Sequence, residues 1–447
     1  MTRLNDLLGW FIVAVIVLSP IPFGSNPPIF WAISGTLVGS VALIYFARLL
    51  ASRQPIRFSL RQIPVATGLF GLLCAFLLIQ MLPLGALIGP FQFVAPGGVT
   101  LETLTLSLAP GSTWMMLIRM LSYGLFFLLA AQVSVNERRA ETLVQFIFWA
   151  IVAHGAFGLI QLTQFGDTLL GAEKTYYRGF ATGTFINRNS YATFIAMGLA
   201  VGTALLAQTV IRVSQGQQRL SQAMLPLVAF VGGMFVLLLA LAASQSRMGL
   251  LSATIGVGIV LLLSLRWVRW QSLLLSLGVT VTVFVVFIGG LLVFGPGLLG
   301  RVVMTEATGG GRTYIYEQVL AMIRTRTWTG FGGGSFELAY PLFKSPPLSP
   351  DYLIDKAHST YLALWSDLGV VAGSLPIVVV AILFGGLVLR YFRAELGSVV
   401  KLAAMGAIIT GATHSTIDFS LEIQGNAYLF VGLLGLGVAV GHRRSRH

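Results

Sequence analysis

The sequence predicts an all-α polytopic membrane protein with about twelve transmembrane helices. Three observations predict this class. Hydrophobic residues make up 56% of the 447 residues and charged residues only 10%, well below the roughly 25% charged residues of soluble domains. Apolar runs close to the ~20 residues that a bilayer-crossing helix needs recur along the whole chain. A helix pairs its own backbone groups, which hydrocarbon requires, so we expect these runs to be helical.

The predicted spans follow one another with short connections, except for one long polar gap. Arg3 precedes the first apolar run, but no small-residue cleavage pattern follows it. We therefore expect this run to remain in the mature chain as the first span. In chain order, the predicted spans cover residues 7–23, 29–50, 63–88, 113–133, 141–162, 190–210, 223–244, 248–265, 272–294, 369–390, 399–418 and 425–441.

The connections alternate in charge, and this alternation predicts the orientation in the membrane. One set is short and basic and holds 17 of the 28 lysines and arginines, namely Arg3, Arg48, Arg53, Arg57, Arg61, Arg138, Arg139, Arg212, Arg219, Arg266, Arg269, Arg390, Arg393, Lys401, Arg443, Arg444 and Arg446. The positive-inside rule assigns such connections to the cytoplasm. We therefore expect both termini in the cytoplasm and residues 295–357 on the outer face, which is the periplasm in a Gram-negative bacterium.

The long polar gap divides the chain into three parts that we expect to form one integrated membrane domain. Residues 1–294 would contain transmembrane helices 1–9, and residues 369–447 helices 10–12. Between them, residues 295–368 would form a large periplasmic loop with amphipathic helices. The single cysteine, Cys74, lies inside an apolar run, which excludes a disulfide framework and a cysteine-based metal site.

The remaining basic residues lie on or near the predicted outer face, against the orientation rule. They are Arg119, Lys174, Arg178, Arg188, Arg247, Arg301, Arg312, Arg324, Arg326, Lys344 and Lys356. The net charge of +13 could suggest nucleic acid, but this distribution favours topology and an anionic, lipid-linked ligand such as a diphosphate. Guanidinium groups pair with phosphate oxygens bidentately. The alternative for each cation is an ion pair with an outward Asp or Glu.

Two short outward segments contain candidate ligand-binding residues. Before the sixth span, Arg178 and Arg188 lie close to Asn187 and Asn189, and the two asparagines can cap the helix that follows. The N-terminus of that helix together with Arg188 would form an anion site, with capping alone as the alternative. Arg247 lies in the tight turn between spans seven and eight, where it either binds an anion or snorkels to lipid headgroups.

The long loop contains the other candidates. Arg312 follows a Gly-Gly-Gly run and leads into an amphipathic helix predicted from Tyr314 to about Thr325, after which the glycine-rich residues 330–336 predict a flexible turn. His358 would open a further helix, with Tyr361, Leu362 and Trp365 on its face. An outward histidine among arginines, with an ordinary pKa near 6.5, is a candidate general base. A structural hydrogen-bonding role is the alternative.

These segments together resemble the O-antigen ligase family of membrane glycosyltransferases. The resemblance extends over roughly residues 178–420 and is specific as an ordered set of short motifs. The motifs are Gly183-Thr-Phe-Ile-Asn-Arg-Asn189, Ser-Gln-Ser-Arg247, Gly-Arg312, Gly330-Phe-Gly-Gly-Gly-Ser-Phe, Ala357-His358-Ser-Thr-Tyr-Leu-Ala-Leu-Trp-Ser-Asp-Leu-Gly369 and His414-Ser-Thr-Ile-Asp418-Phe. The twelve-span layout also matches. Ser359 departs from the pattern, because many relatives place Asn after the histidine.

The resemblance implies an enzyme that transfers a glycan from undecaprenyl diphosphate to a hydroxyl of an acceptor sugar, without metal, cofactor or nucleotide sugar. His358, Arg247 and Arg312 would be catalytic, with His358 as general base and the arginines neutralising the departing diphosphate. Attack opposite the diphosphate would invert the anomeric centre. The substrate-binding residues would be Arg188, Arg178, Asn187, Asn189, Tyr361 and Trp365.

Three functions remain open on this reading. Ligation of O-antigen to lipid A-core, at the periplasmic face of the bacterial inner membrane, is placed first. A polymerase that extends O-antigen or exopolysaccharide is the alternative within the family. A transporter is the alternative from another class, because intramembrane charge and glycine-rich breaks also occur in transporters. Against a transporter, few ionisable residues fall at mid-span.

Overall fold

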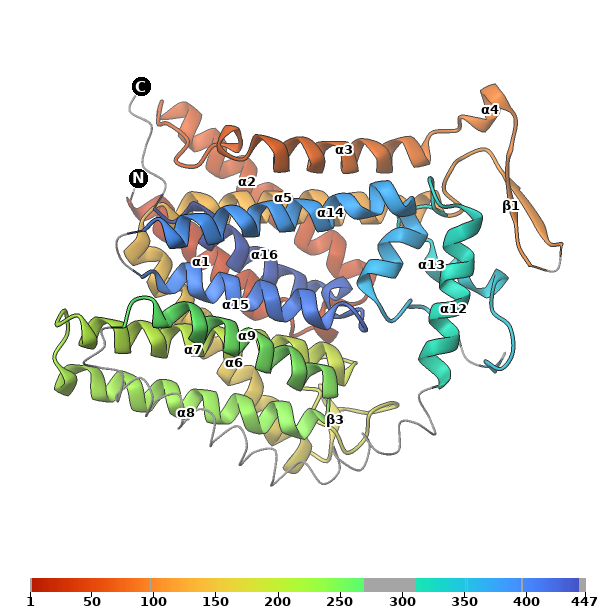
Figure 1. Cartoon of the computed structure of the whole chain (residues 1–447). Coiled ribbons are helices and arrows are strands. Elements are labelled where there is room, and N and C mark those ends of the chain that lie inside the picture. The colour runs from red at the N-terminus through yellow and green to blue at the C-terminus, as the bar shows by residue number, and fades with distance from the viewer. Residues whose placement is uncertain are drawn as a thin grey trace.

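The computed structural model describes residues 2–96, 98–268, 310–349, 351, 353–394 and 397–441. In this part of the chain, long helices lie side by side in a bundle, with a smaller helical and hairpin region at one end (Figure 1). The helices of eight residues or more are α1 (Thr2–Leu18), α2 (Pro28–Ala51), α3 (Pro64–Met81), α5 (Pro110–Ser134), α6 (Glu137–Thr163), α7 (Arg188–Ser214), α8 (Leu220–Ser244), α9 (Arg247–Leu265), α12 (Gly310–Thr325), α14 (Thr360–Phe392), α15 (Val399–His414) and α16 (Gln424–Ala439).

The predicted class, a helical protein that crosses the membrane several times, is confirmed. Among the described residues, eight helices are long and apolar enough to cross a bilayer: α2, α3, α5, α6, α7, α8, α9 and α14. The helices α15 and α16 are apolar but shorter. Most expected spans therefore coincide with a helix of the bundle. The expected ninth span, 272–294, lies outside the described residues.

Three expected spans end several residues earlier than predicted. The first was expected over 7–23, but α1 ends at Leu18, and a turn then leads into the 3₁₀ helix η1 (Phe23–Ser25). The third was expected over 63–88, but α3 ends at Met81, because Pro83 cannot continue a helix. The short helix α4 (Gly85–Ile88) follows. The eleventh was expected over 399–418, but α15 ends at His414. A polar turn and the 3₁₀ helix η5 (Ser420–Glu422) then lead into α16.

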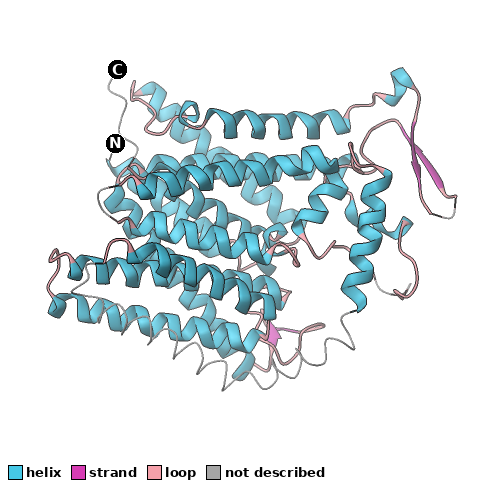
Figure 2. Cartoon of the chain, in the orientation of Figure 1, coloured by secondary structure: helices cyan, strands magenta, loops and turns pink. Residues whose placement is uncertain are grey.

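Two small hairpins accompany the helices of this mostly helical chain (Figure 2). After α4, β1 (Phe91–Val94) pairs antiparallel with β2 (Thr100–Thr103). After α6, β3 (Thr168–Leu169) pairs with β4 (Ala172–Glu173). Phe, Val and Thr in the first hairpin are residue types that favour strands.

Helix α7 is the centre of the bundle. The most apolar 18-residue stretch of this helix is entirely buried, whereas only 17% of the corresponding stretch of α2 is buried. The helices α6, α8, α9 and α15 pack around α7, and α16 packs against α5 and α15. The N-terminus of α7 is consequently held firmly among several helices, which fixes the residues around Asn187 and Asn189 in space.

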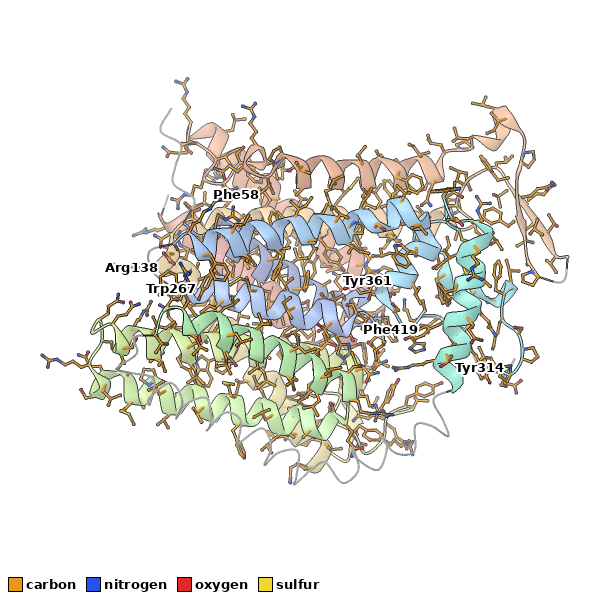
Figure 3. All side chains as sticks on the ribbon, viewed as in Figure 1. Phe58, Arg138, Trp267, Tyr314, Tyr361 and Phe419 are labelled. Atoms are coloured by element: carbon orange, nitrogen blue, oxygen red, sulfur yellow. The ribbon has the colours of Figure 1, made fainter. Side chains whose placement is uncertain are left out.

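The two ends of the bundle differ in character. The turns between α2 and α3, α5 and α6, α7 and α8, and α14 and α15 lie at the end near the two termini, and we call this the basic end (Figure 1). Arg138 and Trp267 lie there, whereas Tyr314 and Phe419 lie toward the opposite end (Figure 3). We call the opposite end, which includes α12, η5 and the start of α7, the site end.

The glycine-rich segment 330–336 is held tightly, so its predicted flexibility is wrong. Phe331 N donates to Ser366 O at 2.9 Å, and Gly332 N donates to Asp367 O at 2.8 Å. A Cβ at Gly330 would collide with the backbone of Asp367. The glycines are therefore needed for close backbone approach to α14 rather than for mobility.

Gln80, at the end of α3, also holds the glycine-rich segment 330–336 against α14. Its side-chain amide donates to Thr329 O at 2.8 Å and to Asp367 O at 3.1 Å, and its carbonyl accepts from Gly333 N at 3.0 Å. Gln80 is fully buried. One side chain therefore joins α3, the glycine-rich segment and α14, which anchors α12 and its connection to the membrane bundle.

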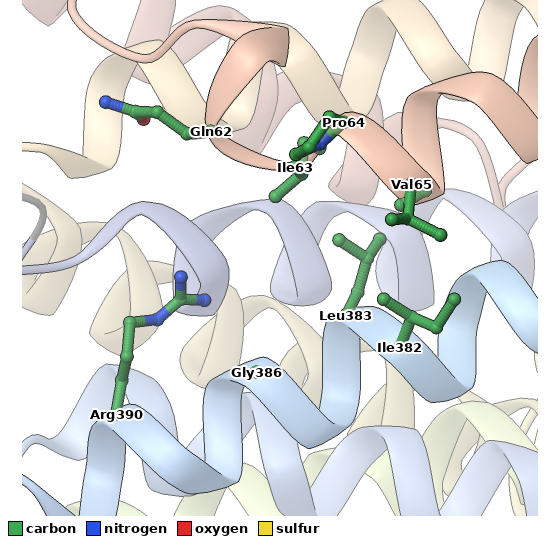
Figure 4. Close-up of a pocket in the computed structure, with 9 residues that line it drawn as sticks. Gln62, Ile63, Pro64, Val65, Ile382, Leu383, Gly386 and Arg390 are labelled. Atoms are coloured by element: carbon green, nitrogen blue, oxygen red, sulfur yellow. The ribbon is translucent and has the colours of Figure 1, made fainter.

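A hollow of about 200 Å³ lies at the basic end, between the start of α3 and the second half of α14 (Figure 4). Its lining includes Gln62, Pro64, Leu383 and Arg390. None of the site residues predicted from the sequence lines this hollow.

Candidate active site

The turn between α15 and η5, residues 415–419, is the segment that the other residues of the candidate site contact. Asp418 is only 1% exposed there. Its carboxylate accepts hydrogen bonds from Asn189 Nδ2 at 3.1 Å and from the Ser420 hydroxyl. The His414 ring lies next to it, with Nδ1 at 3.9 Å from Asp418 Oδ1. A buried carboxylate is thus fixed near the end of the turn that the other site residues contact.

Asn189 connects this carboxylate to the beginning of α9. The Ser246 hydroxyl donates to Asn189 Oδ1 at 3.0 Å and also caps α9 by accepting from Gly249 N at 3.2 Å. Arg247 is the first residue of α9 and is exposed. Asn187 caps α7 by accepting from Asn189 N at 2.7 Å. The chain Ser246–Asn189–Asp418 therefore places the starts of α7 and α9 against the 415–419 turn.

Arg312 reaches the same turn from α12. Its Nη1 donates to Ile417 O at 3.3 Å, and the side chain is otherwise exposed. Arg312 and Ile417 are 105 residues apart in the sequence. The guanidinium therefore lies next to Asp418 and retains further donors that an anion can use.

His358 contacts the turn from a third direction. Its ring meets Phe419 edge to face, with the ring centroids 5.5 Å apart. Burial lowers the pKa of the His358 imidazole, and the Arg312 charge lowers it further, whereas Asp418 and Asp355 act in the opposite sense. The ring is consequently neutral at neutral pH and can accept a proton.

The backbone of His358 corrects its predicted setting. We expected His358 to open a helix and share a face with Tyr361 and Trp365. Instead, α14 begins at Thr360 with Ser359 as its cap, and His358 precedes the helix with a left-handed φ of 53°. A residue with a Cβ seldom adopts this conformation, and such outliers cluster at functional sites.

The residues that follow His358 attach α14 to the 415–419 turn. Thr360 N donates to Ser415 O at 3.1 Å and to Asp418 O at 3.2 Å. The Ser359 hydroxyl accepts from Leu362 N at 3.4 Å. Ser359, the departure from the motif, thus acts here as a helix cap, a role that Ser and Asn both perform.

Two predicted binding residues direct their polar atoms into the fold. The Tyr361 hydroxyl donates to Ala412 O at 2.9 Å, which ties α14 to α15. The Trp365 Nε1 donates to the Ser374 hydroxyl at 3.0 Å across the break at Gly369, where φ is 75°. In the structure these groups hold α14 in place.

Arg188 lies among aromatic rings at the start of α7. Its guanidinium is 4.4 Å from the centroid of Phe180 and 5.8 Å from that of Tyr177. Burial raises the pKa of the Tyr177 phenol, with opposing effects from the Arg188 and Arg312 charges and the Asp418 charge. Arg188, Arg312 and Asp418 therefore act on one shared environment around Tyr177.

Lys174 and Arg178 adopt the ion-paired alternative. Lys174 is 3% exposed and pairs with Asp167, and it also donates to Phe180 O at 2.9 Å. Arg178 pairs with Glu173 and donates from Nε to Lys174 O at 2.8 Å. These contacts fold the loop before α7, so Arg178 contributes to the shape of that loop.

The structure brings further residues to the candidate site, and two of them form a third ion pair. Glu422 of η5 has Lys356 Nζ at 3.7 Å, and its backbone oxygen accepts from Arg119 Nη2. Burial raises the pKa of the Glu422 carboxyl, and the Lys356 and Arg119 charges partly offset this effect. Tyr316 donates from its hydroxyl to His358 O at 2.9 Å. The polar run His414 to Glu422, next to an apolar stretch, was the available signal for Asp418 and Glu422.

The arrangement can bind an anion next to a neutral imidazole. Arg188, Arg247 and Arg312 come from the starts of α7, α9 and α12, three helix N-termini at the site end (Figure 1). Helix N-termini and guanidinium groups both favour negative charge. The geometry suits a reaction in which negative charge departs while His358 takes a proton.

One part of the chain is similar to a known protein family. Residues 232–377 match the family described as O-antigen ligase. The matched range contains Arg247, Arg312 and His358 and ends beyond the break in α14. No curated protein matches the chain. Residues 232–377 therefore carry the O-antigen ligase domain, which confirms the family that the motifs predicted.

Proposed function

We propose that the protein is an inverting glycosyltransferase that needs no metal ion. It moves a glycan from undecaprenyl diphosphate to a hydroxyl on an acceptor sugar, and the favoured reaction is ligation of O-antigen to lipid A-core. One observation carries the proposal: Arg312 and His358 arrive from distant parts of the chain at one turn, beside the fixed carboxylate of Asp418. The family match at residues 232–377 supports the same reaction class.

In the proposed reaction, the acceptor hydroxyl gives its proton to the neutral ring of His358 as its oxygen attacks the anomeric carbon. The bond from that carbon to the diphosphate oxygen breaks, and its electron pair leaves with undecaprenyl diphosphate. Arg312 and Arg247 stabilise the charge that shifts onto the departing oxygen, and preorganised cations of this kind act mainly on the transition state. Because attack and departure occur on opposite faces, the anomeric centre inverts.

The proposed roles of the remaining predicted residues follow from their positions. Arg188, stacked on Phe180, would contact the diphosphate or the first sugar, because it acts on the same environment as Arg312. Asn189 would act through Asp418, to which its amide is bonded. Asn187 contributes the start of α7.

The proposed location is the bacterial inner membrane, with the site end in the periplasm. The support is the charge of the opposite end, where the short turns carry most of the basic residues outside the long loop. A lipid-linked donor in the outer leaflet would then reach the three arginines at the mouth of the bundle. Residues 295–368 would be the catalytic loop, of which the structure describes 310–349, 351 and 353–368.

A reconstituted assay tests the reaction and separates ligase from polymerase. Purified protein in vesicles is incubated with undecaprenyl diphosphate-glycan, with lipid A-core present or absent, and product size and released undecaprenyl diphosphate are measured. A ligase gives a single glycan addition only when lipid A-core is present. A polymerase gives a ladder of lengthened undecaprenyl-linked glycan without it. No released undecaprenyl diphosphate with either acceptor would contradict the proposal.

A further inference from the structure

The conformation of His358 requires a partner that holds it. Its φ of 53° is one that glycine adopts freely and that a Cβ disfavours. The flanking residues are themselves fixed, since Ala357 is buried and Ser359 caps α14. The first backbone hydrogen bond of α14 runs from Ala363 N to Ser359 O, so the His358 carbonyl precedes this ladder and takes its donor from elsewhere.

Tyr316 supplies that donor. Its hydroxyl donates to His358 O at 2.9 Å, across 42 residues of sequence. Tyr316 is partly buried, and burial raises the pKa of its phenol, so the hydroxyl keeps its proton and remains a donor. Among the described residues, this is the contact that joins α12 directly to the backbone of the proposed base.

The same face of α12 also carries Arg312. The two residues are four positions apart, so both side chains project from neighbouring turns of one helix face. The buried apolar side chains Ile315, Val319 and Met322 hold α12 in the cluster that includes Phe331 and Tyr340. The Tyr316 hydroxyl is therefore held in place by packing before any substrate binds.

We propose that Tyr316 is a positioning residue for His358: its hydroxyl fixes the His358 carbonyl and thereby keeps the imidazole against Phe419, between Arg312 and Asp418. The proposal rests on the proposed function, in which His358 takes the proton. Without the hydroxyl, His358 relaxes toward an ordinary backbone conformation, and its ring leaves the geometry that the acceptor hydroxyl requires. Proton transfer then slows while the anion-binding groups remain in place.

The test compares three Tyr→Phe variants. Tyr316→Phe removes one hydroxyl and keeps the ring. Tyr340→Phe removes a hydroxyl that donates to Gln318 Oε1 at 2.8 Å, in the same apolar cluster. Tyr314→Phe alters an exposed residue of the same helix. Each is reconstituted with undecaprenyl diphosphate-glycan and acceptor, and the single-turnover rate, donor affinity, melting temperature and pH profile are measured.

We expect the Tyr316→Phe rate to fall about tenfold, the size of one lost hydrogen bond, with donor affinity and melting temperature near wild type. The acid limb of its pH profile should move upward. Burial and Arg312 lower the pKa of His358, while Asp418 on the turn and Asp355 on its own loop raise it. A relaxed, more hydrated ring returns toward the ordinary pKa of about 6.5 and is protonated at higher pH. A merely structural tyrosine would not move this limb.

The outcomes separate the two proposals. A wild-type rate and pH profile in Tyr316→Phe, while His358→Ala is inactive, would overturn the positioning role and leave the proposed function intact. An equal loss in Tyr340→Phe, or a loss that follows the melting temperature, would also overturn it. Absence of glycan transfer by wild-type protein would overturn the proposed function itself.

Discussion

Charge and hydrogen bonding around single side chains decide what the proposed site can do. Asp418 is held by Asn189 and Ser420, and Arg312 contacts the neighbouring carbonyl of Ile417. Burial and the Arg312 charge lower the pKa of His358, whereas the Asp418 and Asp355 charges raise it. Residue-scale predictions therefore concern these charges one at a time.

We expect the function of Arg312 to require the bidentate geometry of its guanidinium group as well as its positive charge. Arg312→Ala should lower the transfer rate by about 100- to 1,000-fold, the typical effect of removing one group that stabilises a departing oxyanion. Arg312→Lys keeps the charge but cannot bind phosphate bidentately, so we expect most of the loss to remain. Arg138→Ala, which removes an exposed cation at the basic end, is the control and should retain activity. Full activity in Arg312→Ala would remove the residue from the mechanism.

The charge of Asp355 should make a small contribution to the position of the acid limb of the pH profile. Asp355 is exposed and raises the pKa of His358. The proposed base works when neutral, so activity is lost as the pH falls through this pKa. Asp355→Asn lowers the pKa, and activity should persist to lower pH, with a shift below about one unit because the charge is solvated. Rates measured from pH 4.5 to 8 check this expectation, and an upward shift of the limb would contradict it.

At the scale of elements, the site depends on how α12 is attached to the bundle. Gln80 joins α3, the glycine-rich segment 330–336 and α14 through three hydrogen bonds. The glycines there permit contacts that a Cβ would prevent: at Gly332 it would collide with Ser107. The segment thus transmits the position of the membrane helices to α12 and to Arg312.

Gln80→Ala should destabilise the protein and loosen this attachment. It leaves Thr329 O and Gly333 N without their partner, whereas Asp367 O keeps its bond from Gly332 N, and this loss costs roughly 1–3 kcal/mol. Gln217→Ala, in the exposed turn between α7 and α8, is the matched control and should be neutral. Melting of both variants in the same detergent measures the difference. Equal melting temperatures would show that the hydrogen bonds of Gln80 contribute little to stability.

At the scale of the molecule, the sequence predicts where the helices lie, but it does not predict which distant residues meet at the site. Apolar length identified the helices of the bundle, because a bilayer imposes it on each segment separately. The end of α3 at Met81 depends on the local break at Pro83. The left-handed backbone of His358 depends on tertiary contacts. Candidates such as Arg312 and His358 were found by residue type and motif. The sequence did not predict that Asp418 and Tyr316 lie beside these candidates, because the contacts concerned join residues far apart in the chain.

The proposed orientation can be measured with two cysteines in a Cys74→Ser background. Ser345→Cys lies exposed in the loop after α12, and Gln217→Cys lies exposed at the basic end. In cells with a permeabilised outer membrane, an impermeant thiol reagent should label Ser345→Cys and leave Gln217→Cys unlabelled until the inner membrane is disrupted. The reverse pattern would place the site end in the cytoplasm and contradict the proposed location.

The central claim, that His358 takes the proton in glycan transfer, is tested most directly by the single-turnover rate of His358→Ala at saturating donor. General bases contribute about 100- to 10,000-fold, so the account predicts a loss of that size. Donor affinity and melting temperature should stay near wild type, and His358→Gln should be equally impaired because an amide cannot accept the proton. A single-turnover rate near wild type in folded His358→Ala protein would contradict the account.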